Sequence, residues 1–378
     1  MLLYVTGSYP DNKEGIASGA KVLIDAMVDV IGREKILLLT TDMPIITDRI
    51  KDNSLTEYKL LPNWRVTKEN IKAIYAILDN YPISAVHMEY PGDLYGKTFL
   101  ASFLPGIIRR YNKKKGKTIT VNVRLHEFTR ARFLRKLAIL PILWDATRVY
   151  VPAQKDRETV SRLARAKVLT TIIGTNIKVV SSELVNNEKI TISYFGSVYP
   201  GKGIEHMLLI WKKIREMDTA GRFLFKVIGE IDTDEDNHFK EYHRQVWKWI
   251  EQYELKDCIE VTGYVSDEEV SHEIQNSQIA TLFYEDGLTL RRGSFLAYLA
   301  HGIPVVTSMG DEEAYELFNN HSGIAMTEND NQIIQAIMTY VDLTRDVKEK
   351  IRQDNLKLSE IFNWNNIAST FMKDYEIE

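Results

Sequence analysis

The chain has 378 residues, so two domains of roughly 150 to 200 residues are expected. Its 44% hydrophobic and 26% charged residues are typical of a soluble globular protein, and its one cysteine, Cys258, excludes a disulfide framework and a cysteine metal cluster. The net charge of -4 combines +11 in residues 1–185 with -15 in the remainder. The first half is therefore expected either to face an anionic partner or to be only a solvated basic face.

Targeting and membrane-spanning segments are not expected. The N-terminal sequence has neither a basic leader nor a long apolar core, which argues against a signal peptide. The most apolar stretches, near residues 99–108 and 137–144, are short and are interrupted by Pro105 and Pro141. Neither is long enough to cross a bilayer, and together with the cysteine content this predicts a cytoplasmic protein.

Short β-branched runs alternate with helical patterns along the whole chain, which predicts an α/β fold with parallel sheets and crossover helices. The strands expected in the first half are Leu2–Ser8, Ile36–Thr41, Ala85–Glu89, Thr118–Leu125, Arg148–Val151 and Thr170–Ile173. Those expected in the second half are Ile190–Phe195, Phe223–Ile228, Ile259–Thr262, Ile279–Phe283, Pro304–Thr307 and Gly323–Ala325.

Each set of strands begins with a strand–glycine–helix unit, so we predict two Rossmann-like domains. The polar segment Ser181–Lys189 is expected to separate an N-terminal domain of residues 1–183 from a C-terminal domain of residues 187–361. The last part of the chain, 362–378, is expected to form an amphipathic helix that carries Trp364.

Glycines follow the first expected strand and precede a helix over Ala20–Ile31. After the turn that begins at Gly7 come Gly15 and Gly19, where the backbone can approach a ligand and the helix start can face a negative group. The spacing differs from the dinucleotide fingerprint, so an NAD site is disfavoured. The alternative is a tight turn without a ligand.

His126 follows the expected strand Thr118–Leu125, at the edge where parallel sheets bind ligands. It is a candidate hydrogen-bond donor to a substrate hydroxyl or a leaving oxygen, and the alternative is a structural histidine. The segment Phe128–Trp144 mixes arginines with large apolar residues. It is either a helix lying on an anionic membrane surface or, as we slightly favour, an ordinary helix that buries Phe133, Leu137 and Leu140.

The second half opens with a strand that ends at Gly196 and a loop that contains Pro200-Gly201-Lys202-Gly203 before a helix. A lysine between glycines at a helix start is well placed to neutralise a phosphate, although the spacing is not that of a Walker P-loop. The alternative is an exposed turn lysine.

A second candidate anion site lies at Arg291-Arg292-Gly293-Ser294, directly before an apolar helical stretch. Two guanidinium groups, free backbone N–H groups and the positive end of the helix dipole together favour a phosphate or diphosphate. Residues with metal-ligand spacing are not found in the sequence, so no metal is expected.

The order of these features resembles that of the retaining glycosyltransferases of the GT-B fold, family four. The resemblance covers essentially the whole chain, and its most specific parts are YFGSVYPGKG and AHGIPVVTS. It implies two Rossmann-like domains facing across a cleft, with the C-terminal helix crossing back to the first. It also implies that Lys202 contacts the donor diphosphate, that His126 touches the donor sugar, that Gly15 and Gly19 lie beside the diphosphate, and that Trp364 is the aromatic residue of the crossing helix.

Two departures from the family pattern point to a divergent branch. The family usually has an arginine after the strand glycine, where this chain has Ser197. It also has two glutamates eight positions apart before the G-x-P-V-V motif, and alignment on Gly302 places Thr289 and Ala297 there. The usual ribose-binding carboxylate is therefore missing.

The same region offers replacements for the missing groups. We expect Arg291 and Arg292 to supply cationic charge, and Glu285 or Asp286 to take over polar contacts to the sugar. The pattern DGLTLRRGSFLAYLAHGIPVV is similar to that of a branch which we interpret as active.

The function predicted from the sequence is transfer of a sugar from a nucleoside-diphosphate sugar to a glycan or lipid-linked acceptor. The resemblance implies retention of configuration, and a role in cell-surface polysaccharide biosynthesis is expected. The basic first half fits an acceptor at the inner membrane face, with possible peripheral membrane contact. No metal, other cofactor or nucleic acid is expected, since the cations can neutralise the diphosphate. The alternatives are a catalytically silent glycosyltransferase-like binding subunit and a sugar-nucleotide epimerase. The predicted catalytic residues are His126, Lys202 and Arg292, and the predicted donor-binding residues are Gly15, Gly19, Gly196, Ser197, Glu285, Asp286, Arg291, Gly293 and Ser294.

Overall fold

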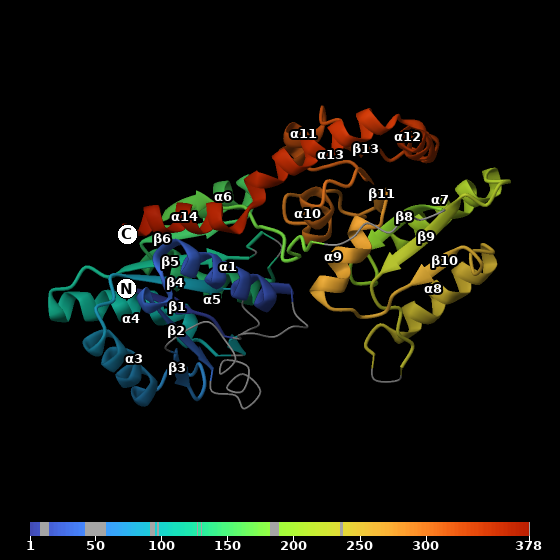
Figure 1. The fold of residues 1–378 in the computed structure, drawn as a ribbon. Helices are drawn as coiled ribbons and strands as arrows, with labels where there is room; N and C mark the ends of the chain where they lie inside the picture. Colours follow the sequence, from blue (N-terminus) through green and yellow to red (C-terminus); the bar gives the residue numbers. More distant parts are fainter. Residues whose placement is uncertain are drawn as a thin grey trace. The chain divides into compact units, whose positions relative to one another are not determined.

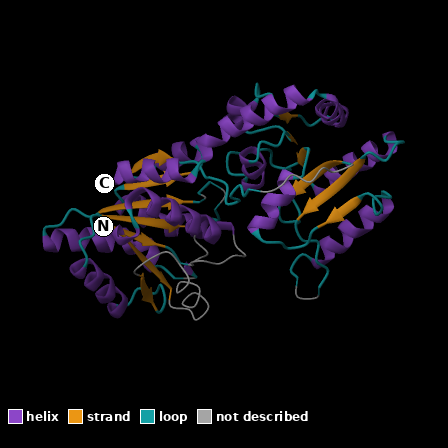
Figure 2. Cartoon of the chain, in the orientation of Figure 1, coloured by secondary structure: helices purple, strands orange, loops and turns teal. Residues whose placement is uncertain are grey.

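The computed structural model describes residues 1–7, 15–41, 58–90, 95–96, 98–126, 128–129, 131–181, 189–234 and 237–377. The chain divides into two compact units, one of Met1–Gly174 with Asn363–Glu378 and one of Thr175–Phe362. Each unit is a parallel sheet flanked by helices (Figure 1; Figure 2). The predicted α/β fold with two Rossmann-like sheets is confirmed.

The first unit contains a seven-stranded parallel sheet with the order β3-β2-β1-β4-β5-β6-β7. Its strands are β1 (Leu2–Val5), β2 (Ile36–Thr41), β3 (Tyr58–Leu61), β4 (Ala85–Tyr90), β5 (Thr120–Leu125), β6 (Arg148–Val151) and β7 (Lys167–Thr170). Its helices are α1 (Gly15–Ile31), η1 (Arg33–Lys35), α3 (Lys68–Asn80), α4 (Leu100–Lys115), α5 (Phe133–Asp145), α6 (Gln154–Ser161) and α14 (Trp364–Tyr375). Tyr90 pairs with Leu125, so β4 and β5 end side by side.

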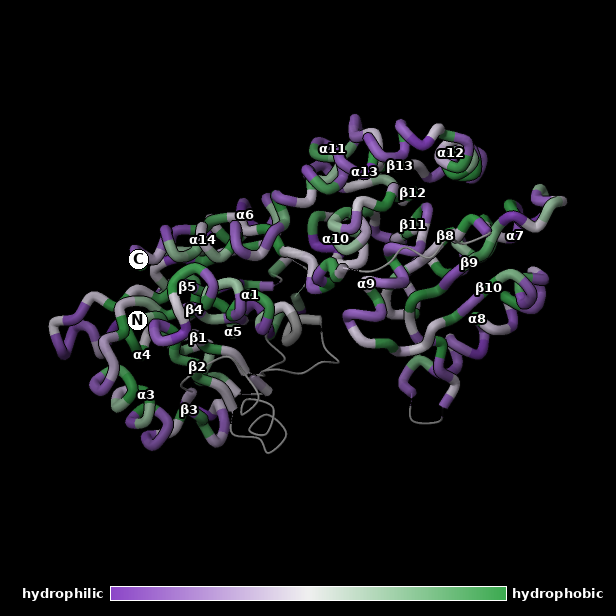
Figure 3. Tube along the Cα trace, viewed as in Figure 1, coloured by the Kyte–Doolittle hydropathy of each residue, from purple (hydrophilic) through white to green (hydrophobic). Residues whose placement is uncertain are grey.

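Helices cover both faces of this sheet. Successive residues of each strand point to opposite faces, so each strand contributes apolar side chains to both layers. Leu3 and Val5 of β1 belong to one buried cluster, which includes side chains of α3, α4 and α5. Leu2 and Tyr4 belong to the other, which includes side chains of α1 and α14. The strands accordingly carry the apolar colour in Figure 3. The helix that contains Trp364 is thereby held on the first unit.

The second unit contains a six-stranded parallel sheet with the order β10-β9-β8-β11-β12-β13. Its strands are β8 (Ile190–Phe195), β9 (Phe223–Ile228), β10 (Ile259–Val261), β11 (Ile279–Leu282), β12 (Val305–Thr307) and β13 (Ile324–Met326). Its helices are α7 (Ile204–Met217), α8 (Lys240–Gln252), α9 (Asp267–Gln275), α10 (Gly293–Ala300), α11 (Glu312–Phe318), α12 (Asp330–Asp342), α13 (Arg345–Ser359) and η3 (Glu360–Phe362).

Several strand bounds differ from the expectation by a few residues, and three elements show larger differences. Strand β3 was not expected, because its sequence YKLL is short and only its last residue is buried. Strand β7 lies at Lys167–Thr170 rather than Thr170–Ile173, since its register with β6 pairs Arg148 with Lys167. Helix α1 begins at Gly15, five residues before the expected start.

The boundary between the compact units falls before Thr175, whereas the break was expected within Ser181–Lys189. Val180, directly before Ser181–Lys189, is hydrogen-bonded to helix α9 of the second unit. The Val180 N–H donates to Ser271 Oγ at 3.1 Å, and the Gln275 amide donates to the Val180 carbonyl at 2.9 Å. Residues 182–188 lie outside the described part of the chain.

The favoured prediction for the segment 128–144 is wrong for Phe133 and Leu137, whereas Leu140 is partly buried and packs against the core. Helix α5 packs through Ile139, Ile142 and Leu143, whereas Phe133 is 73% exposed and Leu137 is 46% exposed. The apolar residues of this helix form two faces, and only one of them meets the core. No helix among the described residues combines the length and apolar character needed to cross a bilayer.

Candidate active site

The order of strands in the second sheet creates a point where two loops diverge. Strand β8 lies between β9, which follows it in the chain, and β11, which belongs to the other half of the sheet. Ligands of open α/β sheets bind outside the carboxyl ends of strands at such a switch point. The loops that leave β8 and β11 here are those that contain Lys202 and residues 283–292.

Glycines allow these two loops to touch. Gly203 has a φ of +66°, and a Cβ placed on it would lie 1.6 Å from the carbonyl oxygen of Phe283. The same two loops are also joined by a hydrogen bond of 3.4 Å, which the Glu285 N–H donates to the Gly201 carbonyl. Only glycine satisfies both the left-handed backbone and the close approach at residue 203. The loop with Lys202 is thus fixed against the end of β11.

Tyr284 lies at the centre of the predicted cationic residues. The Lys202 ammonium is 6.0 Å from the centroid of its ring, and the Arg292 guanidinium is 4.3 Å from it. The Tyr284 hydroxyl and Ser294 Oγ are 2.7 Å apart. We call these four residues the Tyr284 cluster. Burial raises the pKa of Tyr284 to about 12, so its hydroxyl remains protonated at neutral pH.

The two predicted arginines have different surroundings. Arg292 donates hydrogen bonds to Asp286 and, at 3.2 Å, to the Gly287 carbonyl. Its Nε is buried without an acceptor among the described residues. The Arg291 backbone N–H donates to Thr289 Oγ1 at 3.3 Å. Arg292 and Asp286 were expected to meet the ligand separately, and the structure pairs them with each other.

Within the described part of the chain, two of the predicted cations have no acidic partner. Among the described residues, neither the Lys202 ammonium nor the Arg291 guanidinium forms an ion pair, and Lys202 instead lies 4.8 Å from the ring centroid of Tyr199. The start of α10 follows directly, and its N-cap residue Arg292 makes no side-chain capping bond. Gly293 is exposed there. As far as the described residues show, the site therefore combines positive charge without an acidic partner with the backbone N–H groups at the start of α10.

The remaining donor residues of the second unit lie at the same edge of the sheet. Gly196 ends β8, and a Cβ on it would lie 3.8 Å from the Cβ of Ser294. Ser197, which stands in place of the family arginine, is exposed and accepts a hydrogen bond from the Tyr194 hydroxyl through its carbonyl at 3.0 Å.

The predicted histidine of the first unit contacts a buried carboxylate that sequence reasoning missed. His126 Nε2 lies 2.5 Å from Oε2 of Glu89, whose side chain is 1% exposed. The other oxygen, Oε1, accepts from the Tyr4 hydroxyl at 3.0 Å, His87 Nε2 at 3.1 Å and Arg124 Nη1 at 3.2 Å. We call these five residues the Glu89 network.

The charges in this network have physical causes. Burial alone would raise the pKa of Glu89, but the positive groups of Arg124 and His126 and the hydrogen bonds hold it well below its usual range. Burial lowers the pKa of His87, so this ring is neutral. Since His87 Nε2 must donate to the carboxylate, its Nδ1 accepts from the Tyr375 hydroxyl at 2.6 Å.

The C-terminal helix completes the surroundings of this network. Trp364 of α14 lies over Arg124, with the guanidinium carbon 5.4 Å from the centroid of the ring. Gly15 begins α1 and Gly19 lies in its second turn. The turn that precedes them, residues 8–14, lies outside the described residues, so their predicted contact with a diphosphate stays a prediction.

One available signal pointed to the missed residues. Glu89 and Arg124 are charged residues inside expected strands of a buried parallel sheet, and a buried charge is retained only where a partner neutralises it. The signal does not say which residues are the partners. The role of Tyr284 was harder to predict from the sequence, because an aromatic residue at the end of a strand is usual in any core.

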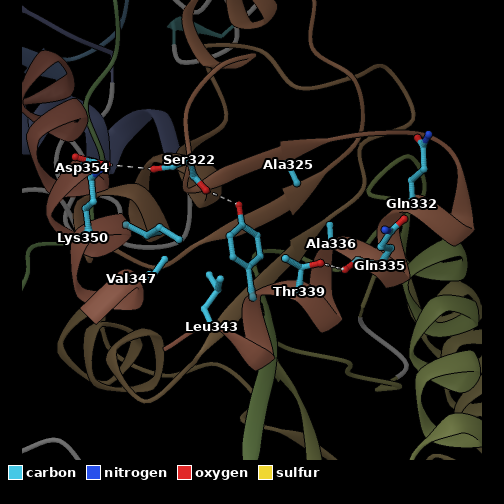
Figure 4. Close-up of a pocket in the computed structure, with 12 residues that line it drawn as sticks. Ser322, Ala325, Gln332, Gln335, Ala336, Thr339, Leu343, Val347, Lys350 and Asp354 are labelled. Carbon is cyan, nitrogen blue, oxygen red and sulfur yellow. Dashed lines mark hydrogen bonds between the residues drawn. The ribbon is translucent and has the colours of Figure 1, made fainter. Parts of the chain in front are cut away.

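A separate hollow of about 590 Å³ lies against α12, α13 and β13 (Figure 4). The Tyr340 hydroxyl donates to the Ser322 carbonyl at 2.8 Å, and Ser322 Oγ donates to Asp354 at 3.2 Å. Its other lining is largely aliphatic, including Leu343 and Val347. None of the predicted site residues lines it, and it lacks a convergent set of cations.

Comparison with known proteins bears on the second unit directly. Residues 189–342 match the sequence family described as glycosyl transferases group 1. The match lies within the second unit and covers less than half of the chain. The cationic switch-point site lies within the residues that are similar to this glycosyltransferase family. No curated protein matches the chain by sequence.

Solved structures share the fold over the full length of the chain. A glycosyltransferase from Rickettsia africae has a TM-score of 0.75 at 14% identity, with 99% of this chain and 97% of that one covered. The Anabaena protein HepE in complex with UDP has a TM-score of 0.72 at 12% identity, covering 99% of each chain. Sucrose-phosphate synthase from Thermosynechococcus elongatus has 0.68 at 14%, covering 99% and 98%. The fold is thus that of GT-B glycosyltransferases.

Proposed function

We propose that the protein transfers a sugar from a nucleoside-diphosphate sugar to an acceptor hydroxyl with retention of configuration. We further propose that the diphosphate binds at the Tyr284 cluster together with the adjacent Arg291 and Gly293. The observation that carries this proposal is that Lys202 and Arg291, in the loops at the switch point of the second sheet, form no ion pair with any described acidic residue. An anion is the ligand that such a site favours.

The chemistry follows from where charge develops. When the bond from the sugar carbon to the diphosphate breaks, negative charge grows on the leaving phosphate and positive charge on the sugar ring. Fixed donors aimed at that charge lower the barrier, and one such donor is worth roughly 3 kcal/mol. Lys202, Arg291 and the N–H groups of Gly293 and Ser294 would supply these donors. We propose that added divalent metal is therefore not required for turnover.

The partners of the proposed reaction are inferred more indirectly. UDP and UDP-glucose are the ligands bound to HepE, so we propose a uridine diphosphate sugar as the first donor to test. The acceptor we propose is a glycan or lipid-linked sugar used in cell-surface polysaccharide. We place His126 of the first unit beside the reacting sugar, with Gly15 and Gly19 near the diphosphate. Glu285 remains the candidate for a polar contact to the donor.

A panel of nucleotide sugars, scored first by thermal shift and then by transfer to lipid-linked and glycan acceptors, tests the proposal. A ligand at a hundred times its dissociation constant stabilises the protein by about 2.7 kcal/mol. Lys202→Ala is expected to lower turnover roughly 100-fold, which corresponds to one lost donor. Lys212→Ala is the matched control, because Lys212 also lies over a tyrosine ring, 5.5 Å from Tyr253, but away from the switch point. Equal rates for both variants would remove the diphosphate role.

A catalytically silent binding subunit is the second candidate function. The pairing of Arg292 with Asp286 favours it, because the ion pair occupies two groups expected to replace the missing glutamates. Calorimetric binding of a nucleotide sugar without hydrolysis or transfer, across the whole acceptor panel, would support this reading over catalysis. An epimerase would instead release free nucleotide in the absence of any acceptor.

We also propose that the first unit contacts a membrane through α5. Phe133, Leu134, Leu137 and Trp144 lie on one face of this helix and are 73%, 78%, 46% and 46% exposed. Arg132 is exposed directly before the helix. An apolar helix face with adjacent positive charge suits an anionic lipid surface, and it would bring the protein to a lipid-linked acceptor.

Co-sedimentation with vesicles tests this contact. The wild type is expected to bind phosphatidylglycerol vesicles more strongly than phosphatidylcholine vesicles, and Leu134→Ser to bind weakly. Val66→Ser is the control, because Val66 is also an exposed apolar residue of the first unit, at 52%. Absence of wild-type binding, or equal binding by the two variants, would refute a role for α5.

A further inference from the structure

The contact between His126 and Glu89 determines which atom of the imidazole is available. An ionised carboxylate only accepts hydrogen bonds, so Nε2 of His126 must carry a proton whether the ring is neutral or charged. Among the described residues, none forms a hydrogen bond with Nδ1. The His126 side chain is 21% exposed, against 1% for Glu89. The ring therefore reaches from a buried anchor toward solvent.

We propose that Glu89 is a positioning residue: it holds the imidazole of His126 with Nε2–H directed at its carboxylate, so that Nδ1 is the atom presented to the sugar. This inference rests on the proposed function, which places His126 beside the reacting sugar. A carboxylate that fixes the tautomer and orientation of a histidine has the same effect in the serine hydrolase triad.

The surroundings of Glu89 suit it to this task. Its Oε1 is occupied by three donors, from Tyr4 on β1, His87 on β4 and Arg124 on β5. Only Oε2 is left for His126. Because the donors come from three adjacent strands, the carboxylate has little freedom to rotate, and a rigid supporting group is what an oriented side chain requires.

The same arrangement predicts what a neutral replacement does. In Glu89→Gln the amide oxygen is expected to take the Oε1 position, because Tyr4, His87 and Arg124 all donate there. The amide NH₂ then faces His126, and a donor at that position requires Nε2 to become an acceptor. The proton of the neutral ring moves to Nδ1, and the atom that faced the sugar as an acceptor becomes a donor.

Nitrogen-15 NMR of the full chain, labelled in its histidine rings, reads this change without any activity assay. At about pH 8, where an ordinary histidine is neutral, the wild type is expected to show protonated Nε2 for His126. In Glu89→Gln the His126 proton is expected on Nδ1, while His87 keeps its proton on Nε2 and acts as the internal control. A wild-type His126 ring with its proton on Nδ1 and none on Nε2, or an unchanged His126 tautomer in the variant, overturns the proposal. If the variant does not fold, the wild-type spectrum decides.

Turnover measurements separate positioning from mere structural support. Glu89→Gln is expected to lower turnover about 10- to 100-fold, the effect of one well-placed hydrogen bond to a charged group, with the KM for donor nearly kept. In the His126→Ala background the same change is expected to cost less than about 2-fold, because Glu89 acts through the ring. If the losses in turnover from Glu89→Gln and His126→Ala add in the double variant, Glu89 does not act through the His126 ring. A wild type that fails to transfer any sugar rejects the proposed function, while the tautomer result stands by itself.

Discussion

Replacement of Gly203 by alanine probes how closely the two loops of the second unit must approach. Gly203 has a φ of +66°, and its added Cβ would lie 1.6 Å from the Phe283 carbonyl oxygen and 2.6 Å from the carbonyl carbon. Gly221 is a matched control, because its φ is +63° and a Cβ there meets nothing within 4 Å. Both variants carry the same left-handed strain, and only Gly203→Ala carries the clash.

The left-handed backbone is expected to cost each variant about 1–2 kcal/mol. The clash is expected to add about 1–3 kcal/mol at Gly203, because a backbone carbonyl must move rather than a flexible side chain. Urea unfolding monitored by circular dichroism gives the difference between the two variants. Calorimetry with UDP should show weaker binding only for Gly203→Ala, since Lys202 moves with the loop. Equal stability of both variants, or unchanged UDP binding by Gly203→Ala, would refute this reasoning.

Two further predictions concern buried polar groups. Burial lowers the pKa of His301. The stability that the neutral ring contributes is therefore present at pH values above the ordinary histidine pKa, and it is lost as the pH falls through the lowered pKa. We expect the urea midpoint to fall between about pH 7 and pH 5, and to fall less steeply in His301→Gln. An identical pH dependence would contradict this. Tyr375→Phe leaves the buried His87 Nδ1 without its donor and should cost about 1–3 kcal/mol. Tyr150→Phe should cost less, because its partner Asp374 is only partly buried and can bind water; the reverse order would exclude this account of α14.

The strands of both sheets were largely predictable because buried parallel strands have a simple sequence signature. Ile36–Thr41, Arg148–Val151, Ile190–Phe195 and Phe223–Ile228 occur as expected. Strand β3 was not predicted, because it is an edge strand with one fully buried residue and lacks that signature.

The buried face of α5 was predicted wrongly for a different reason. Its apolar residues occur on two sides of the helix, and periodicity alone does not say which side meets the core. Phe133 was expected inside, yet Ile139 and Leu143 occupy the buried side. The outcome depends on packing with the neighbouring helix and sheet, which the local sequence does not contain.

The candidate site was predictable only where its residues carry a local motif. Glycines around Lys202 and the Arg291–Ser294 sequence identified a cationic loop and a helix start, and both lie at carboxyl strand ends of the second sheet. Glu89 and His126 are 37 positions apart, and their contact arises from the register of β4 and β5. No local pattern contains that register.

The most direct test of the central claim compares a nucleoside diphosphate with the monophosphate. Calorimetry with UDP and UMP on the wild type, Lys202→Ala and Arg291→Ala isolates the contribution of the second phosphate. The cationic site predicts that both variants lose affinity for UDP, by roughly tenfold or more for a lost charged hydrogen bond, while UMP binding changes little. UDP affinity equal to that of the wild type in both variants would contradict a diphosphate site between these residues.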